Sequence, residues 1–183
     1  GDVAALAGAL ELGKSNVLGI AMGTSEAVGY VNHDGLITGW LNELAFAPVD
    51  LSTDAMEDEW SGDIGCGVKY FSQDGIIKLA GFANIDLSKG DSPAKKLKIV
   101  QSLMRDGDDR AIKVYKSLGT YLGHTLALYH EMYEMENVLM LGRVMSGDGG
   151  QVIYDTANKV LDDEYPSVAK SMKIHLPDEK SRR

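Results

Sequence analysis

Two short glycine-containing stretches of the sequence carry residue types that could contact a phosphate. Gly23 ends an apolar run, residues 16–23, that is typical of a buried strand, and Thr24 follows it. Glycine lets the backbone approach a phosphate closely, and threonine offers a hydroxyl group. The pair is also common in ordinary turns. The residues alone therefore leave open whether this turn binds a phosphate or only reverses the chain.

The second stretch, "LGRVMSGDGG", follows the apolar run at residues 137–142 and contains Gly142, Ser146 and Gly147. One interpretation is a plain strand-to-helix turn, with the next helix starting in the glycines after Ser146. In the other, that helix begins beside a nucleotide, because the free amides of a helix amino terminus favour anions. Both interpretations stay open.

Two glutamates occupy positions where a carboxylate is unexpected, one near a possible phosphate turn and one among apolar residues. Glu26 lies two residues after the Gly-Thr pair, where a carboxylate pointing inward would repel a phosphate unless Mg²⁺ lay between them. Glu43 lies among Trp40, Leu44 and Phe46, so its carboxylate must meet water, a partner or a ligand. Asp2 stands at the start of a helical pattern and is expected to cap it.

Composition limits the function classes. The chain has 183 residues, 44% of them hydrophobic, and a net charge of -9, which suits one globular domain without a nucleic-acid surface. The basic clusters, which are typical of solvated surface, are Lys95, Lys96 and Lys98, and Lys180, Arg182 and Arg183. A single cysteine, Cys66, excludes an internal disulfide and a zinc site built from several thiolates. No bilayer-spanning run or signal pattern is visible, so we expect a cytoplasmic protein without membrane contact.

The elements follow one another in a definite order. A helical pattern opens the chain, and three antiparallel strands are predicted across residues 16–40, with a hairpin turn at Asp34 and Gly35. An acidic loop at residues 52–67 precedes helices in residues 68–135, a strand at 137–142, a helix at 149–165 and a strand at 172–176. This order predicts an α/β fold: a mixed sheet containing a three-stranded antiparallel meander, with helices on both faces and late parallel crossovers.

The order of elements, together with "LGIAMGTSEAVGYVNHDGLITGWLNELA" and "NVLMLGRVMSGDGG", resembles the second half of sugar kinases of the repressor, open reading frame and kinase (ROK) family. The resemblance covers nearly the whole chain and implies the actin-like ATPase (ribonuclease H-like) fold. It also implies that residues 1–183 are the C-terminal, nucleotide-side lobe, with a helical section at about 68–134. The N-terminal lobe would then be absent, and both ends do look like those of an excised piece.

The resemblance implies specific site residues. The nucleotide and its phosphates would contact Gly23, Thr24, Gly142, Ser146 and Gly147. Asn42 and Glu43 would bind the sugar, since "NELAF" matches the family's "Glu-Ile-Gly-His" segment. With Asp2 on the second asparagine of the family's opening helix, the catalytic aspartate falls just before Gly1, so no catalytic residue is expected in this chain. Asp2 could take that role only if the spacing were shortened.

The match also exposes what is missing. Phe46 stands on a histidine that contacts sugar and binds zinc in the family, Val68 replaces a second sugar-binding glutamate, and Cys66 matches only one of its zinc-binding cysteines. Structural zinc needs four N or S ligands, so no zinc is expected.

Two functions therefore remain. In the first, the intact protein is an ATP- and Mg²⁺-dependent hexose kinase, and this lobe alone is inactive. In the second, it is a non-catalytic relative that senses a sugar or a nucleotide, or acts by dimerising. Expected partners are a sugar, a nucleotide and a second copy in a homodimer.

Overall fold

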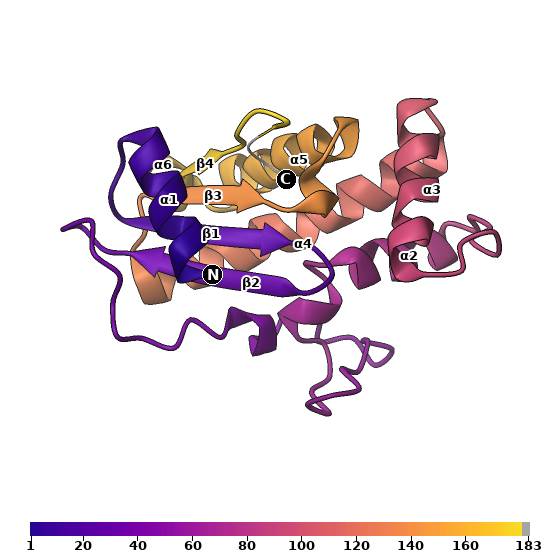
Figure 1. Ribbon diagram of the computed structural model, residues 1–183, viewed down its shortest axis with the longest axis horizontal. Coiled ribbons are helices and arrows are strands. Elements are labelled where there is room, and N and C mark those ends of the chain that lie inside the picture. Colours follow the sequence, from indigo (N-terminus) through magenta and orange to yellow (C-terminus); the bar gives the residue numbers. More distant parts are fainter. Residues whose placement is uncertain (181–183) are drawn as a thin grey trace.

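The computed structural model describes residues 1–180, which form a four-stranded mixed sheet with helices on both faces (Figure 1). The strands are β1 (Val17–Met22), β2 (Glu26–Val31), β3 (Asn137–Leu141) and β4 (Lys173–His175). Their order in the sheet is β2-β1-β3-β4. Strands β1 and β2 are antiparallel, whereas β3 is parallel to both β1 and β4. The predicted α/β class and mixed sheet are therefore confirmed.

The helices are α1 (Asp2–Leu12), α2 (Gln73–Phe82), α3 (Pro93–Arg105), α4 (Asp109–Tyr133), α5 (Asp148–Glu164) and α6 (Pro166–Ser171). Three short 3-10 turns are η1 (Leu44–Phe46), η2 (Gly67–Lys69) and η3 (Arg143–Met145). In Figure 1, α1 lies in front of the sheet, α4 and α5 pass behind it, and α2 and α3 lie beyond the arrowheads of β1 and β3. Among the residues described, no helix has the length and apolar character needed to cross a bilayer.

The predicted three-stranded antiparallel meander is wrong. Its third strand is reduced to an isolated bridge between Val31 and Ile37. Asn32 closes the turn before that bridge, where its side-chain oxygen accepts hydrogen bonds from two backbone amides. Beyond the bridge, the ring of Trp40 stacks on that of Tyr30 with centroids 5.5 Å apart. This stacking draws the chain away from the edge of β2, so no further strand pairing follows.

Two hydrophobic clusters pack against opposite faces of the sheet. The larger cluster joins the strands to the helices behind them and includes buried side chains from β1 and a long stripe on α4: Leu18, Ile20, Met22, Val114, Tyr115, Leu118, Leu122 and Leu126. The smaller one joins Ala5 and Ala9 of α1 to Val17, Val31 and Leu139. Because α1 presents alanines to the sheet, it can lie close to the strands.

The start of α1 lies against the middle of β2 because glycines face each other there. A Cβ atom added to Gly29 would overlap the backbone of Asp2, and one added to Gly1 would overlap the carbonyl group of Val28. Gly19 of β1 makes a similar close contact with Ala5. Any side chain at these glycines would push the helix off the sheet. The position of Asp2 is thus set by backbone-to-backbone packing.

We expect Gly29→Ala to lower the free energy of unfolding by about 1–3 kcal/mol, because the added methyl group cannot fit without moving α1. Urea denaturation followed by circular dichroism measures the loss. The control is Gly81→Ala in α2, where an added Cβ meets nothing within 4 Å. That change should leave stability equal or raise it by up to ~1 kcal/mol. An equal loss in both variants would contradict the close contact.

Candidate functional site

The residues predicted to contact a nucleotide lie in two turns at the carboxyl ends of β1 and β3: Gly23, Thr24, Gly142, Ser146 and Gly147. The turn after β3 touches the last residue of β1, because a Cβ atom on Gly142 would overlap the backbone of Met22. Gly142 and Gly147 have φ angles of 96° and 69°, which favour glycine. Ligands of open α/β sheets bind outside the carboxyl ends of the strands. The structure therefore brings all five residues to an edge suited to ligand binding.

The turn at Gly23 also has a structural role. The carbonyl group of Gly23 accepts a hydrogen bond from the amide of Gln73 at 2.9 Å. Gln73 is the first residue of α2, and the hydroxyl group of Ser72 caps that helix by accepting from the amide of Asp74 at 3.2 Å. The turn thus reverses the chain and fixes the start of α2, while Thr24 remains exposed.

A cavity of about 550 Å³ opens beside these turns, and we call it the basic cavity. Its lining is Gln73, Ala94, Leu97, Lys98, Gln101, Arg143 and Ser146. The side-chain amide of Gln101 donates to the carbonyl of Arg143 at 2.9 Å, which ties α3 to the turn after β3. Two cations at one cavity suit an anionic ligand. The sequence does not reveal this pairing, because Lys98 and Arg143 are far apart along the chain.

A second cavity of about 290 Å³ lies beside the start of α1, and we call it the acidic cavity. Its lining is Gly1, Asp2, Glu26, Ala27, Val28, Trp40, Leu41, Asn42, Glu43 and Ala45. Both residues predicted to bind a sugar, Asn42 and Glu43, belong to it. Glu43 precedes η1 and is exposed at the rim of this cavity. Of water, a partner and a ligand, the three environments considered for its carboxylate, the structure shows exposure to water.

The carboxylate of Asp2 does not cap α1, contrary to the prediction. Its Oδ1 atom instead accepts hydrogen bonds from the backbone amide of Tyr30 at 3.2 Å and from the side-chain amide of Asn42 at 2.8 Å. The hydroxyl group of Tyr133 donates to Asn42 Oδ1 at 3.0 Å. Asp2 and Asn42 are therefore held in one polar chain at the acidic cavity.

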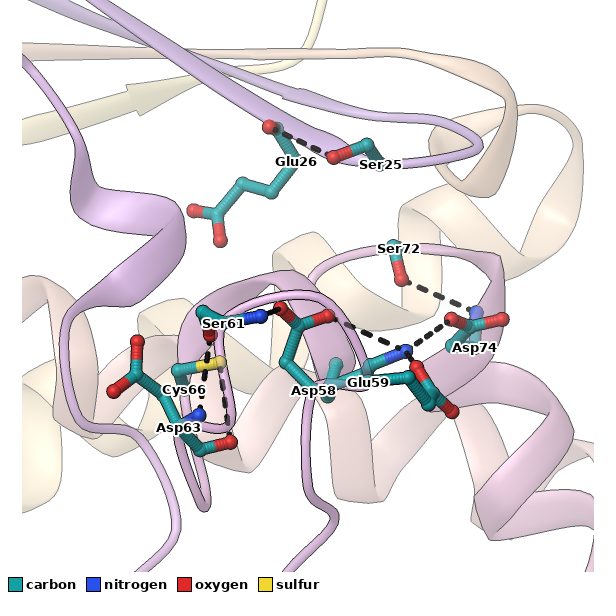
Figure 2. Close-up of polar contacts among 10 residues, drawn as sticks. Ser25, Glu26, Asp58, Glu59, Ser61, Asp63, Cys66, Ser72 and Asp74 are labelled. Carbon is teal, nitrogen blue, oxygen red and sulfur yellow. Dashed lines mark hydrogen bonds and ion pairs between the residues drawn. The ribbon is translucent and has the colours of Figure 1, made fainter.

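The side chain of Glu26 is buried rather than exposed at the turn. Its side chain enters the space between β2 and the loop below it, and among the described residues both carboxylate oxygens lack a hydrogen-bond partner (Figure 2). Val28 and Tyr30 point to the same buried side, as strand alternation requires. That alternation is the sequence signal that could have placed Glu26 inside.

Phe46 and Cys66 lie in the loop that matches the zinc-binding segment of the ROK family. The ring of Phe46 packs near that of Trp60, with centroids 5.8 Å apart. Cys66 is buried, and its Sγ atom lies 4.0 Å from the carbonyl oxygen of Asp63 (Figure 2). Within the described chain, no group of three or more His, Cys, Asp or Glu side chains is arranged to hold a metal ion.

Two largely buried lysines hold this loop in place. The ammonium group of Lys69 pairs with Asp58 at 3.6 Å, with Asp74 at 3.2 Å and with Glu59 (Figure 2). Because these three carboxylates come from both sides of η2, the lysine joins the acidic loop to the start of α2. The sequence shows only an acidic stretch here and does not indicate its cationic centre.

The second lysine, Lys78, lies 3.5 Å from Asp50, whose Oδ2 atom also accepts a hydrogen bond from the hydroxyl of Tyr70 at 2.5 Å. Burial raises the pKa of Asp50, but hydrogen bonds from Tyr70 and Ser52 and the charge of Lys78 outweigh burial and lower the pKa to about 2. The ionised carboxylate is thus strongly favoured in the folded protein.

Solved structures of ROK proteins share this fold. The chain superposes on a ROK family transcriptional regulator, described as a homologue of the E. coli MLC protein, with a TM-score of 0.73 and 17% identity, covering 98% of this chain and 47% of that one. It superposes on a ROK family glucokinase from Streptomyces griseus, in complex with glucose and AMPPNP, with a TM-score of 0.64 and 17% identity. That match covers 90% of this chain and 57% of the glucokinase. It superposes on a ROK hexokinase from Thermus thermophilus with a TM-score of 0.70 and 15% identity. That match covers 99% of this chain and 60% of the hexokinase.

These matches confirm the ROK resemblance at the level of the fold, and with it the actin-like architecture. The chain spans 47–60% of the length of these three proteins. No protein-family model matches the sequence, and no curated protein matches it. Because both kinases and a regulator share the fold, the function must be argued from the two cavities.

We expect Asp50→Asn to lower the free energy of unfolding near pH 7 by roughly 2 kcal/mol, because the variant loses the ionised acceptor of Tyr70 and Lys78. A carboxylate whose folded-state pKa is depressed contributes stability above its unfolded pKa and loses it as the pH falls through the folded value. The difference from the unmodified protein should therefore shrink between about pH 4 and about pH 2. Urea denaturation across this range measures it.

The control is Asp54→Asn, at an exposed position of the same loop, which should change stability little at any pH. A difference for Asp50→Asn that stays constant down to pH ~2 would contradict the assigned ionisation.

Proposed function

We propose that this chain is the C-terminal, nucleotide-side lobe of an ATP-dependent hexose kinase whose other lobe is encoded elsewhere in a longer chain. One observation carries the proposal. A cavity with two cations lies at the carboxyl ends of β1 and β3, and a cavity lined by carboxylates lies beside β2 of the same sheet. Phosphoryl transfer to a sugar needs both, because it joins a polyanionic donor to a hydroxyl acceptor.

The basic cavity would receive the nucleotide. Lys98 and Arg143 supply positive charge, and the amino terminus of α5 adds the positive end of its helix dipole. The amide of Gly147 donates to Glu179 Oε2 at 2.8 Å, so a phosphate would have to replace that carboxylate to reach it. Thr24 offers an exposed hydroxyl group at the neighbouring turn. ATP would bring the γ-phosphoryl group, with Mg²⁺ reducing its charge. These residues position and neutralise the donor without a covalent step.

The acidic cavity would receive the sugar. Asn42 and Glu43 offer a fixed amide and an exposed carboxylate, which are suited to hydrogen bonds with sugar hydroxyl groups. Asp2 then takes the proton as the hydroxyl oxygen bonds to the γ-phosphorus and the bond to the ADP oxygen breaks. This assignment takes the alternative in which the spacing of the family's opening helix is shortened, so that Asp2 replaces a base before Gly1. It is supported by the hydrogen bonds from Tyr30 and Asn42 that orient the Asp2 carboxylate.

A sugar-sensing regulator is the second candidate. It is supported by the regulator among the structural neighbours and by Phe46 at the position of the family's histidine. A sensor would bind sugar in the acidic cavity and transfer nothing. The two functions therefore differ in turnover and share the binding site.

In the full-length protein, we expect Asp2→Asn to lower kcat for ADP formation with a hexose by roughly 10²–10⁴-fold, because no other positioned base replaces it. A coupled ADP assay over a hexose panel gives kcat and KM separately. Asp54→Asn is the matched control and should keep full activity. If the unmodified protein binds a hexose but forms no ADP with any of them, the sensor replaces the kinase.

The isolated chain is expected to form no ADP, because a single lobe cannot close water out of the cleft. It should nevertheless bind ATP, and Arg143→Gln or Lys98→Gln should weaken that binding about tenfold as measured by calorimetry. Lys95→Gln is the control on the same helix, since Lys95 pairs with exposed Asp91. Equal weakening by all three changes would mean that charge acts only at long range.

A further inference from the structure

The carboxyl group of Glu26 is the most unusual buried group in the described chain. Both of its oxygens are inaccessible to solvent and lack a hydrogen-bond partner within residues 1–180. Buried polar groups in folded proteins are nearly always hydrogen-bonded, and a buried charge is nearly always paired. A carboxyl group placed this way needs a physical explanation.

Three elements close around this carboxyl group. Gly67 of η2 leaves room for it, because a Cβ atom at that position would overlap Glu26 Oε2 and lie 2.8 Å from the carbonyl oxygen of Leu44 in η1. The hydroxyl group of Tyr129 in α4 donates to the same carbonyl at 3.4 Å. The carboxyl group therefore lies at the junction between β2, η1, η2 and α4, packed directly against Gly67.

No cation faces the carboxyl group at this junction. The titratable groups flanking this junction include Tyr30 of β2, Tyr129 of α4, Glu43 before η1, and Asp2 of α1 at the shared cavity. Cys66 precedes η2 and Lys69 ends it. Lys69 is committed to three other carboxylates. Burial raises the pKa of Tyr129 and the charge of Glu26 raises it further, while burial also raises that of Cys66. Nothing here favours an ionised Glu26.

Burial alone raises the pKa of Glu26 to about 8. Below that pH the group is neutral and costs little more than its missing hydrogen bonds. Once ionised, it is a buried charge without a partner, and the least costly relief is to admit water. The short turns η1 and η2 belong to an irregular segment, which can leave β2 more easily than α4 can. The ion pairs of Lys69 with Asp74 and of Asp50 with Lys78 keep this segment attached to α2, so it swings about that attachment.

We propose that Glu26 is a pH-sensitive switch: protonated, it lets the segment from Asn42 to Lys69 close on the sheet, and ionised, it releases that segment and opens the acidic cavity. The structural part of this proposal is independent of the proposed function. Its consequence, that mildly alkaline pH weakens sugar binding, rests on that function, because Asn42 and Glu43 move with the segment.

Both tryptophans of the chain lie at or inside this segment, Trp40 stacked on Tyr30 and Trp60 near Phe46, so fluorescence reports its state. We would record tryptophan emission and amide hydrogen exchange, corrected for intrinsic rates, from about pH 6 to about pH 10. The expected result is a transition near pH 8, with faster exchange in residues 42–69 and unchanged exchange in α5.

Two variants test whether Glu26 causes the transition. Glu26→Gln keeps the size of the side chain but cannot ionise, so it should abolish the transition and keep the segment closed. Glu131→Gln makes the same chemical change at an exposed position on α4 and should leave the transition in place. A transition that persists in Glu26→Gln, or its absence from the unmodified protein, would overturn the proposal.

A direct titration keeps the test decisive even if Glu26→Gln does not fold. Carbon-13 NMR of glutamate side-chain carboxyls in the unmodified protein should show Glu26 titrating near pH 8, and titration near its ordinary value of 4.5 would overturn the switch. Glucose binding at about pH 7 and about pH 9 separates the two proposals. Equal binding at both overturns the coupling, whereas a transition without sugar binding at any pH supports the switch and overturns the sugar site.

Discussion

The close backbone contact between α1 and β2 is the constraint on which the acidic cavity depends. Strand β2 is at the edge of the sheet, so the amide of Tyr30 points away from β1 and needs an acceptor. Because Gly29 lets the helix start lie directly on the strand, Asp2 reaches that amide and covers it. The same carboxylate orients Asn42. One packing contact therefore satisfies the sheet edge and arranges the polar groups of the cavity.

Charge pairs hold the loop that follows the acidic cavity. Lys69 forms ion pairs with carboxylates of the loop and of α2. Asp50 forms an ion pair with Lys78 and accepts a hydrogen bond from Tyr70. Removing charges from water is costly, and such groups are stable only when every partner is present. This arrangement fixes the path of the chain between η1 and η2. It thereby fixes the groups that enclose Glu26, so the geometry of the acidic cavity depends on residues that do not touch it.

The sequence predicted most of the sheet and the turns at its carboxyl edge, because β1 and β3 are buried on both faces and appear as continuous apolar runs. It failed where side chains distant in the chain decide the outcome. Trp40 stacks on Tyr30 and packs at a tilt against Tyr133 instead of extending a third strand. The bonding of Asp2 and the meeting of Lys98 with Arg143 likewise depend on contacts between separate segments, which no local pattern encodes.

The pairing of β1 with β3 has a consequence for how the chain is made. The two strands are neighbours in the sheet, yet the whole acidic loop and helices α2–α4 lie between them in sequence. During synthesis the β1–β2 hairpin must therefore wait, with one side of β1 unpaired, until β3 leaves the ribosome. An apolar strand open on one side can pair with other nascent chains. Chaperones that shield this hairpin during synthesis should accordingly raise the yield of folded protein in the cell.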